Sequence, residues 1–153
     1  MTRIPLVLLL LVSLVLLSAT DPVVGTWKLN VAKSKYIPGP PPKSQTRIYF
    51  EDKTGVRALV VTVYRNGDTD TVHYRATYDG KEHPVSGAPD RDGIAMKQLS
   101  PYSAESILTH AGVTIGEAHR TVSGDGRTMT ITYKGVLNGE PVNNTALYER
   151  EPD

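Results

Sequence analysis

The stretch Val24-Gly25-Thr26-Trp27-Lys28-Leu29 contains the only tryptophan of the 153-residue chain and opens its first strand-like run. Nine further runs rich in β-branched residues and tyrosine follow it. Together the ten runs cover residues 24–31, 44–51, 56–65, 69–79, 81–86, 93–99, 104–110, 113–122, 128–134 and 142–150. Short runs of this kind, separated by Gly, Asp, Asn and Pro, are typical of an all-β domain.

The joints between these runs contain strong hairpin signals. Asn66-Gly67 and Asp79-Gly80 tolerate the positive φ angles of two-residue hairpin turns, and Gly124-Asp125-Gly126 and Asn138-Gly139 serve the same purpose. Sequential hairpins produce an antiparallel meander. Because closure removes the exposed edges of a meander, the sequence predicts a ten-stranded antiparallel up-and-down β-barrel, with a β-sandwich as the alternative.

The alternation along several runs separates two faces of each strand. In the run 44–51, one face holds Thr46, Ile48 and Phe50, and the other holds Arg47, Tyr49 and Glu51. One face must be buried, because a shift by one residue would turn the whole set over. The lumen of a cavity-bearing barrel can be mixed in polarity, so the pattern leaves open which face points inward.

Residues 1–20 resemble a secretory signal peptide. Arg3 supplies a positive charge, the apolar run 6–17 follows, and Ser18-Ala19-Thr20 provides small residues for cleavage. An uncleaved anchor is the alternative, but the run is shorter than the ~20 apolar residues that span a bilayer. We expect residues 21–153 to form one domain, without stable membrane insertion after cleavage.

The expected domain is neutral and contains no cysteine. Without Arg3, 16 Lys and Arg stand against 16 Asp and Glu, so the basic excess that nucleic acid or an anionic membrane surface selects is missing. The absence of cysteine excludes disulfides and thiol chemistry. An exported domain without disulfides favours a bacterial periplasmic or secreted location, and we expect a monomer.

Two segments interrupt the meander. Residues 33–43 contain Pro38-Gly39-Pro40-Pro41-Pro42, a composition that excludes a helix and a central strand. This segment is either a stiff strap over the mouth of the barrel or a plain connector between the first two strands. The polar loop 86–93 is expected to border the other side of the opening.

Both ends of the chain resemble the calycin superfamily. The opening 21–29 is similar to the start of intracellular fatty-acid-binding proteins, and Lys134-Gly135-Val136 with Leu147-Tyr148-Glu149-Arg150 is similar to their last two strands. The opening Gly-x-Trp is shared with lipocalins. The chain also resembles exported bacterial lipocalin-like proteins with Gly-Thr-Trp-Lys-Leu-Asn and Pro-Gly-Pro-x-Pro-Lys segments. The resemblance implies a barrel whose lumen holds a fatty acid or retinoid.

The resemblance also implies a site for a carboxylate. The fatty-acid-binding family holds this group with an Arg-x-Tyr pair on the last strand and an arginine two strands earlier. Here Tyr148 matches the tyrosine, Ala146 stands where the last-strand arginine would be, and Arg120 falls at the earlier position. The helical lid of the family is replaced by the Pro-rich segment. The implied site therefore pairs an anion with Arg120 and the Tyr148 hydroxyl.

Tyrosine is the dominant aromatic residue, with eight against one Phe and one Trp. Tyrosine suits a lumen that binds an amphipathic ligand, and it equally suits half-buried strand positions. The candidate binding residues are Arg120, Tyr148, Tyr133, Tyr74 and Tyr78, whereas Tyr36 and Tyr102 are expected on the surface. Trp27 is expected to close one end of the barrel by packing, with its indole N–H bonded to one acceptor.

The sequence shows no metal site and no catalytic set. The four histidines, His73, His83, His110 and His119, lack zinc-ligand spacing, and there is no G-x-S-x-G elbow, cysteine nucleophile or paired-carboxylate motif. We therefore expect no enzyme activity, cofactor or metal. The expected function is binding of a small hydrophobic or amphipathic, fatty-acid-like molecule in the lumen. The alternative is a protein- or glycan-interaction module with a filled barrel.

Overall fold

The computed structural model describes residues 19–153, so nearly all of the predicted signal peptide lies outside the described residues. The elements are β1 (Gly25–Leu29), the 3-10 helix η1 (Val31–Lys33), β2 (Lys35–Ile37), β3 (Ser44–Asp52), β4 (Gly55–Val63), β5 (Thr69–Thr77), β6 (Glu82–Ser86), β7 (Gly93–Ser100), β8 (Ser103–His110), β9 (Val113–Val122), β10 (Thr128–Leu137) and β11 (Glu140–Arg150). No helix within this part of the chain is long and apolar enough to cross a membrane.

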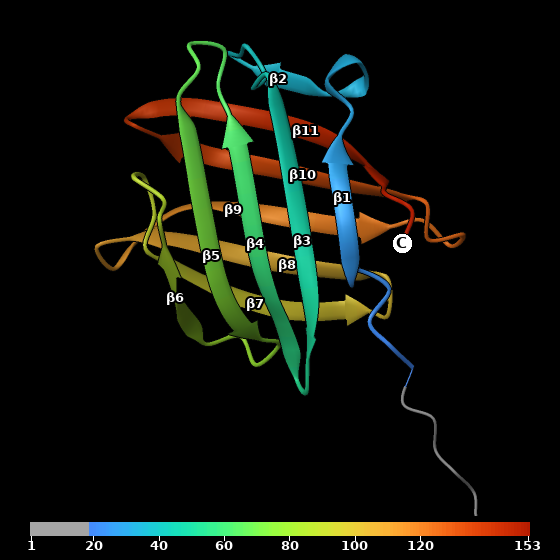
Figure 1. The fold of residues 1–153 in the computed structure, drawn as a ribbon. Helices are drawn as coiled ribbons and strands as arrows, with labels where there is room; N and C mark the ends of the chain where they lie inside the picture. The colour runs from blue at the N-terminus through green and yellow to red at the C-terminus, as the bar shows by residue number, and fades with distance from the viewer. Residues whose placement is uncertain (1–18) are drawn as a thin grey trace, which may run out of the picture.

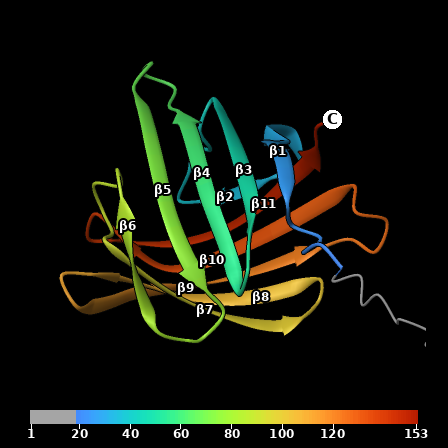
Figure 2. The same ribbon diagram turned by 60° about the horizontal axis from the view of Figure 1, so that its bottom comes forward.

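The strands form a closed antiparallel barrel. From β3 to β11 each strand pairs with the next one along the chain, and β1 pairs with both β3 and β11. This closure confirms the predicted ten-stranded up-and-down barrel and excludes the β-sandwich. Figures 1 and 2 show β1 and β3–β5 running steeply across β7–β11, so the lumen lies between two crossing walls. The barrel is consistent with the calycin resemblance without being specific to it.

An additional strand that the sequence pattern did not reveal, β2, pairs with β11. β1 pairs only with the end of β11, from Tyr148 to Arg150, and β2 pairs with an earlier part of β11, from Asn143 to Thr145. Between them the chain makes the single turn of η1, which Asn30 caps by accepting a hydrogen bond from the Lys33 N–H.

A network around Trp27 closes one end of the barrel. Trp27 is fully buried, and its indole N–H donates to the Val23 carbonyl at 2.8 Å, which confirms the predicted packing role. The Arg150 guanidinium stacks 4.2 Å from the Trp27 ring centroid and donates to the carbonyls of Pro22, Val24 and Gly126. The other large, fully buried side chains at this end are Met129, Val56 and Val23.

Gly25 is required by this plug. Its φ angle of +134° lies in a region that side chains rarely adopt, and a Cβ atom at this position would overlap the Arg150 Nη1 atom. The Gly-x-Trp opening thus has a structural explanation, because the glycine admits the arginine that stacks on the tryptophan.

Candidate binding cavity

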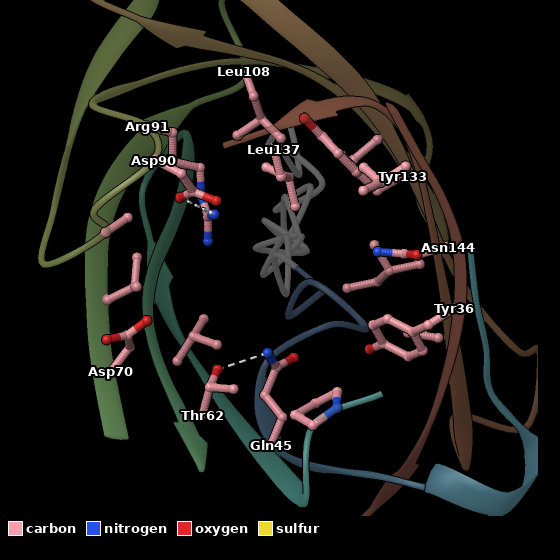
Figure 3. Close-up of a pocket in the computed structure, with 18 of the residues that line it drawn as sticks. Tyr36, Gln45, Thr62, Asp70, Asp90, Arg91, Leu108, Tyr133, Leu137 and Asn144 are labelled. Atoms are coloured by element: carbon pink, nitrogen blue, oxygen red, sulfur yellow. Dashed lines mark hydrogen bonds and ion pairs between the residues drawn. The ribbon is translucent and has the colours of Figure 1, made fainter. Parts of the chain in front are cut away.

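A cavity of about 550 Å³ occupies the lumen above the Trp27 plug. This volume falls within the ~300–1,000 Å³ that is usual for small-molecule sites. In Figure 3, Gln45, Thr62 and Asp70 point into the cavity from one wall, and Tyr133, Asn144 and Tyr36 point into it from the opposite wall. The interior is therefore not completely filled by side chains.

The cavity lining contains ten apolar side chains along its walls, beside polar ones such as Gln45, Thr62 and Asn144, and it has a polar, charged floor. The apolar side chains come from both walls and are Val60, Val72, Ile94, Met96, Leu108, Ala118, Ile131, Leu137, Val142 and Ala146. Two arginines and three tyrosines gather where the cavity meets the plug, and they are Arg47, Arg120, Tyr49, Tyr74 and Tyr148. We call these five residues the floor. This division suits a ligand with a charged head and an apolar body.

Arg47 on β3 is bound to Tyr148 on β11 across the intervening β1. The Arg47 Nε atom donates to the Tyr148 hydroxyl and to the Gln45 Oε1 atom, both at 3.0 Å. Tyr148 in turn donates to the same Gln45 oxygen, whose amide N–H₂ group donates to Thr62 at 2.8 Å. Among the described residues no carboxylate forms an ion pair with Arg47. The Arg47 guanidinium is therefore hydrogen-bonded only to neutral groups.

Arg120 on β9 is buried, with 8% of its surface exposed, and is only partly satisfied. Its Nη2 atom donates to the Tyr78 hydroxyl at 2.8 Å, and Tyr78 donates to the Asp21 carboxylate. The Arg120 Nε atom is buried without a hydrogen-bond partner. A buried guanidinium N–H without an acceptor costs free energy, so this side of the floor favours an incoming acceptor.

Tyr49 lies between the two arginines. The Arg47 Nη1 atom is 3.4 Å from its hydroxyl, and the Arg120 guanidinium lies 5.2 Å from its ring centroid. Burial alone would raise the pKa of this phenol, but the positive charges of Arg47 and Arg120 outweigh burial, so the pKa lies below its ordinary value. The same positive field favours an anionic group of a ligand.

The mouth of the cavity is formed by loops at the other end of the barrel. The residues Ile37–Pro42 line it, and the Arg65 Nε atom donates to the Pro41 carbonyl at 3.0 Å. The segment 35–43 is therefore a strap that borders the mouth and is tied to the β4–β5 hairpin. The loop residues 88–91 line the cavity as well, in agreement with the expectation for 86–93, and Arg91 pairs there with Asp90 at 2.9 Å.

Four of the five candidate binding residues line the cavity, and three of these lie at its floor. Arg120, Tyr148 and Tyr74 belong to the floor, whereas Tyr133 lies near the strap-bordered mouth with its hydroxyl donating to the carbonyls of Ile115 and Val136. Tyr78 is not among the lining residues. It lies behind Arg120 and connects that residue to Asp21.

The expectation that Tyr36 lies on the surface is wrong. Tyr36 on β2 lines the cavity beside Asn144, its pairing partner on β11, and burial raises the pKa of its phenol well above the ordinary value. Tyr102 is 43% exposed, as expected. The error arises because β2, which turns Tyr36 inward, consists of three residues within a Pro-rich segment.

Arg47 and Tyr49 are the floor residues that sequence reasoning did not select. The alternation had separated them from Thr46, Ile48 and Phe50, and the more apolar of these two faces points outward, leaving Phe50 42% exposed beneath Arg57. Arg47 supplies a guanidinium beside Tyr148, although Ala146 stands where the last strand would carry an arginine of the Arg-x-Tyr pair. The register would have revealed it, because closure brings β3 within two strands of β11.

The histidines make no metal cluster. Within residues 19–153 no group of three or more His, Cys, Asp or Glu side chains could hold a metal ion. His83 on β6 is bound to Thr77 and Asp79 at the β5–β6 turn.

No protein-family model matches the chain, and no curated protein and no solved structure matches it. The function is therefore inferred from the geometry of the cavity.

Proposed function

We propose that this protein is an exported binding protein for a small amphipathic anion of the fatty-acid type, held in the barrel lumen with its charged group at the floor. The observation that carries the proposal is the position of Arg47 and Arg120 at the bottom of an apolar cavity, with no carboxylate paired to Arg47 among the described residues. Buried charges in proteins are normally paired, and an anionic ligand would provide the partner.

The chemistry of the lining supports this orientation. Each arginine presents N–H groups in a plane, which matches the two oxygens of a carboxylate, and the Arg120 Nε atom has no other acceptor. The tyrosines provide hydroxyls and flat ring surfaces beside the head group, and the aliphatic side chains above them cover a hydrocarbon body. The ligand would enter past the strap and place its apolar end near the mouth.

The calycin resemblance agrees with this proposal but requires a different anion clamp. The two ends of the chain resemble fatty-acid-binding proteins, whose last-strand arginine is replaced here by Ala146. We propose that Arg47 takes the place of this missing arginine, because its Nε atom lies 3.0 Å from the Tyr148 hydroxyl. The clamp would then consist of Arg47, Arg120 and Tyr148.

Titration of the delipidated protein with a fluorescent fatty acid tests the proposal. We expect saturable binding at micromolar concentration, and we expect Arg47→Gln to weaken it about ten-fold or more, because a charged hydrogen bond is worth about 1.5–3 kcal/mol. Arg57→Gln removes an exposed arginine from β4 and is the matched control, for which we expect unchanged affinity. Absence of saturable binding, or equal effects of the two substitutions, would contradict the proposal.

The alternative function, a protein- or glycan-interaction module, assumed a filled barrel. The cavity of about 550 Å³ offers no support for that assumption. Native mass spectrometry of the freshly purified protein separates the two proposals, since a co-purified small molecule is expected only for a lumen-binding protein.

A further inference from the structure

We infer that Asp21 sets the charge of the ligand that the cavity accepts, and that the preferred head group carries a single negative charge. This inference rests on the proposed function and adds to it a specificity-determining residue outside the cavity. Asp21 reaches the floor through one phenol, because Tyr78 donates to Asp21 Oδ2 and accepts a hydrogen bond from Arg120 Nη2. It is therefore a positioning residue that acts through Arg120.

The side-chain charges around the cavity balance to one unpaired positive charge. The charged residues of the lining are four arginines and two aspartates, namely Arg47, Arg65, Arg91, Arg120, Asp70 and Asp90. At the mouth the two arginines are matched in number by the two aspartates. At the floor, Asp21 offsets Arg120 through Tyr78, whereas Arg47 contacts only neutral groups. A singly charged head group completes the balance.

Asp21 is held firmly enough to serve as a fixed charge. Its Oδ1 atom accepts a hydrogen bond from the Val23 N–H, and its carbonyl accepts one from the Val24 N–H. The following backbone is bound in turn by Arg150, which donates to the carbonyls of Pro22 and Val24. Burial, and to a lesser degree Asp21, raise the pKa of Tyr78 to about 12 against the effect of Arg120. The link between Asp21 and Arg120 thus remains protonated.

A second negative charge on the ligand would meet this arrangement unfavourably. It would lie near Arg120 and repel the Asp21 carboxylate on the other side of Tyr78, in a region of low effective dielectric constant. Asn at position 21 can still accept the hydrogen bond from Tyr78 but carries no charge. Asp21→Asn therefore removes the charge of the network and preserves its hydrogen-bond geometry.

The test compares three ligands with the same twelve-carbon chain, each used below its micellar concentration at pH 9, where the α-amino group that cleavage after Thr20 leaves on Asp21 is mostly neutral. Dodecanoate carries one negative charge, dodecyl phosphate carries two at this pH, and dodecanol carries none. The protein is expressed from the full 153-residue sequence, and affinities are measured by displacement of a fluorescent fatty acid. The matched control is Asp125→Asn, which removes an exposed carboxylate from the β9–β10 turn at the plugged end.

We expect the wild-type protein to bind dodecanoate about ten-fold more tightly than dodecyl phosphate. We expect Asp21→Asn to reduce this preference about five-fold without changing the affinity for dodecanol. We expect Asp125→Asn to leave both the preference and the affinity for dodecanol unchanged. A purely structural role of Asp21 would instead alter the affinities of all three ligands by the same factor, and that result would overturn the inference.

Two further outcomes decide against the inference. If the wild-type protein binds the doubly charged ligand as tightly as the singly charged one, the inference is overturned, and this comparison needs no variant to fold. If the wild-type protein binds none of the three ligands, the proposed function is overturned together with the inference.

Discussion

Replacement of Arg150 by methionine tests whether the plug at the closed end holds the barrel together. The Arg150 side chain donates three hydrogen bonds, of 2.5 to 2.6 Å, to the carbonyls of Pro22, Val24 and Gly126, and it stacks 4.2 Å from the Trp27 ring centroid. It therefore joins the last strand to the N-terminal segment and to the β9–β10 turn. Methionine fills similar space but satisfies none of the three carbonyls.

The expected loss is large for a single substitution. A hydrogen bond that involves a charged group contributes about 1.5–3 kcal/mol, and the stacked guanidinium adds about 0.5–2 kcal/mol. These contributions are not additive, since water replaces part of the lost bonding, so we expect a decrease in unfolding free energy of about 3–5 kcal/mol. For a domain of this size that decrease corresponds to a melting temperature about 10–15 °C lower.

Thermal and urea denaturation followed by tryptophan fluorescence measures this change, because Trp27 is the only tryptophan and lies within the plug. Arg127→Met is the control, since it removes an exposed arginine from the neighbouring β9–β10 turn. Arg150→Lys should be nearly as harmful as Arg150→Met, because lysine keeps the charge but lacks the planar group that binds three acceptors. If Arg150→Met were no more destabilising than the control, the plug would not hold the barrel closed.

The remaining predictions concern one glycine, two tyrosines and the strap. Gly25→Ala should cost about 1–3 kcal/mol in thermal denaturation because of its φ angle, whereas Gly124→Ala, which meets open space, should cost little. Folding raises the pKa of Tyr78 from 10 to about 12, so its contribution to stability is complete below pH 10 and is lost as the pH rises towards 12. Urea denaturation at increasing pH should show this loss of stability in the wild-type protein and not in Tyr78→Phe. The pKa of Tyr49 is shifted in the opposite direction, to below its ordinary value. Ultraviolet titration should therefore show one phenol that ionises early, and this early ionisation should be absent from Tyr49→Phe. Arg65→Gln frees the strap, and stopped-flow measurements should show faster ligand dissociation with little change in stability.

Local turn chemistry and alternation were sufficient to predict the barrel. Asn138-Gly139 adopts positive φ at both residues (+50° and +81°), whereas in Asn66-Gly67 and Asp79-Gly80 only the glycines do (+93° and +72°). Arg120 and His119 occupy opposite faces of β9, with Arg120 buried and His119 exposed. These features depend on neighbouring residues alone, and sequence patterns contain that information.

The composition of the floor depended on information that no single strand contains. Arg47 and Tyr148 are 101 residues apart, and they meet because β1 pairs with β3 on one side and β11 on the other. On β3 the hydrophobic pattern even favours the outward face, since Ile48 and Phe50 are more apolar than Arg47. Under the proposed function this reversal is expected, because the inner face of β3 then contacts a ligand rather than a core.

The plug and the floor adjoin at the closed end of the barrel, yet they satisfy a buried arginine to different degrees, and this contrast is the strongest physical reason to expect a ligand. At the plug, Arg150 is fully engaged, with three carbonyl acceptors and an aromatic ring. At the floor, Arg120 is more deeply buried and yet its Nε atom has no acceptor. The fold can therefore satisfy an arginine completely where the role is structural. We therefore expect the acceptor for Arg120 Nε to come from outside the chain, as the proposed function requires.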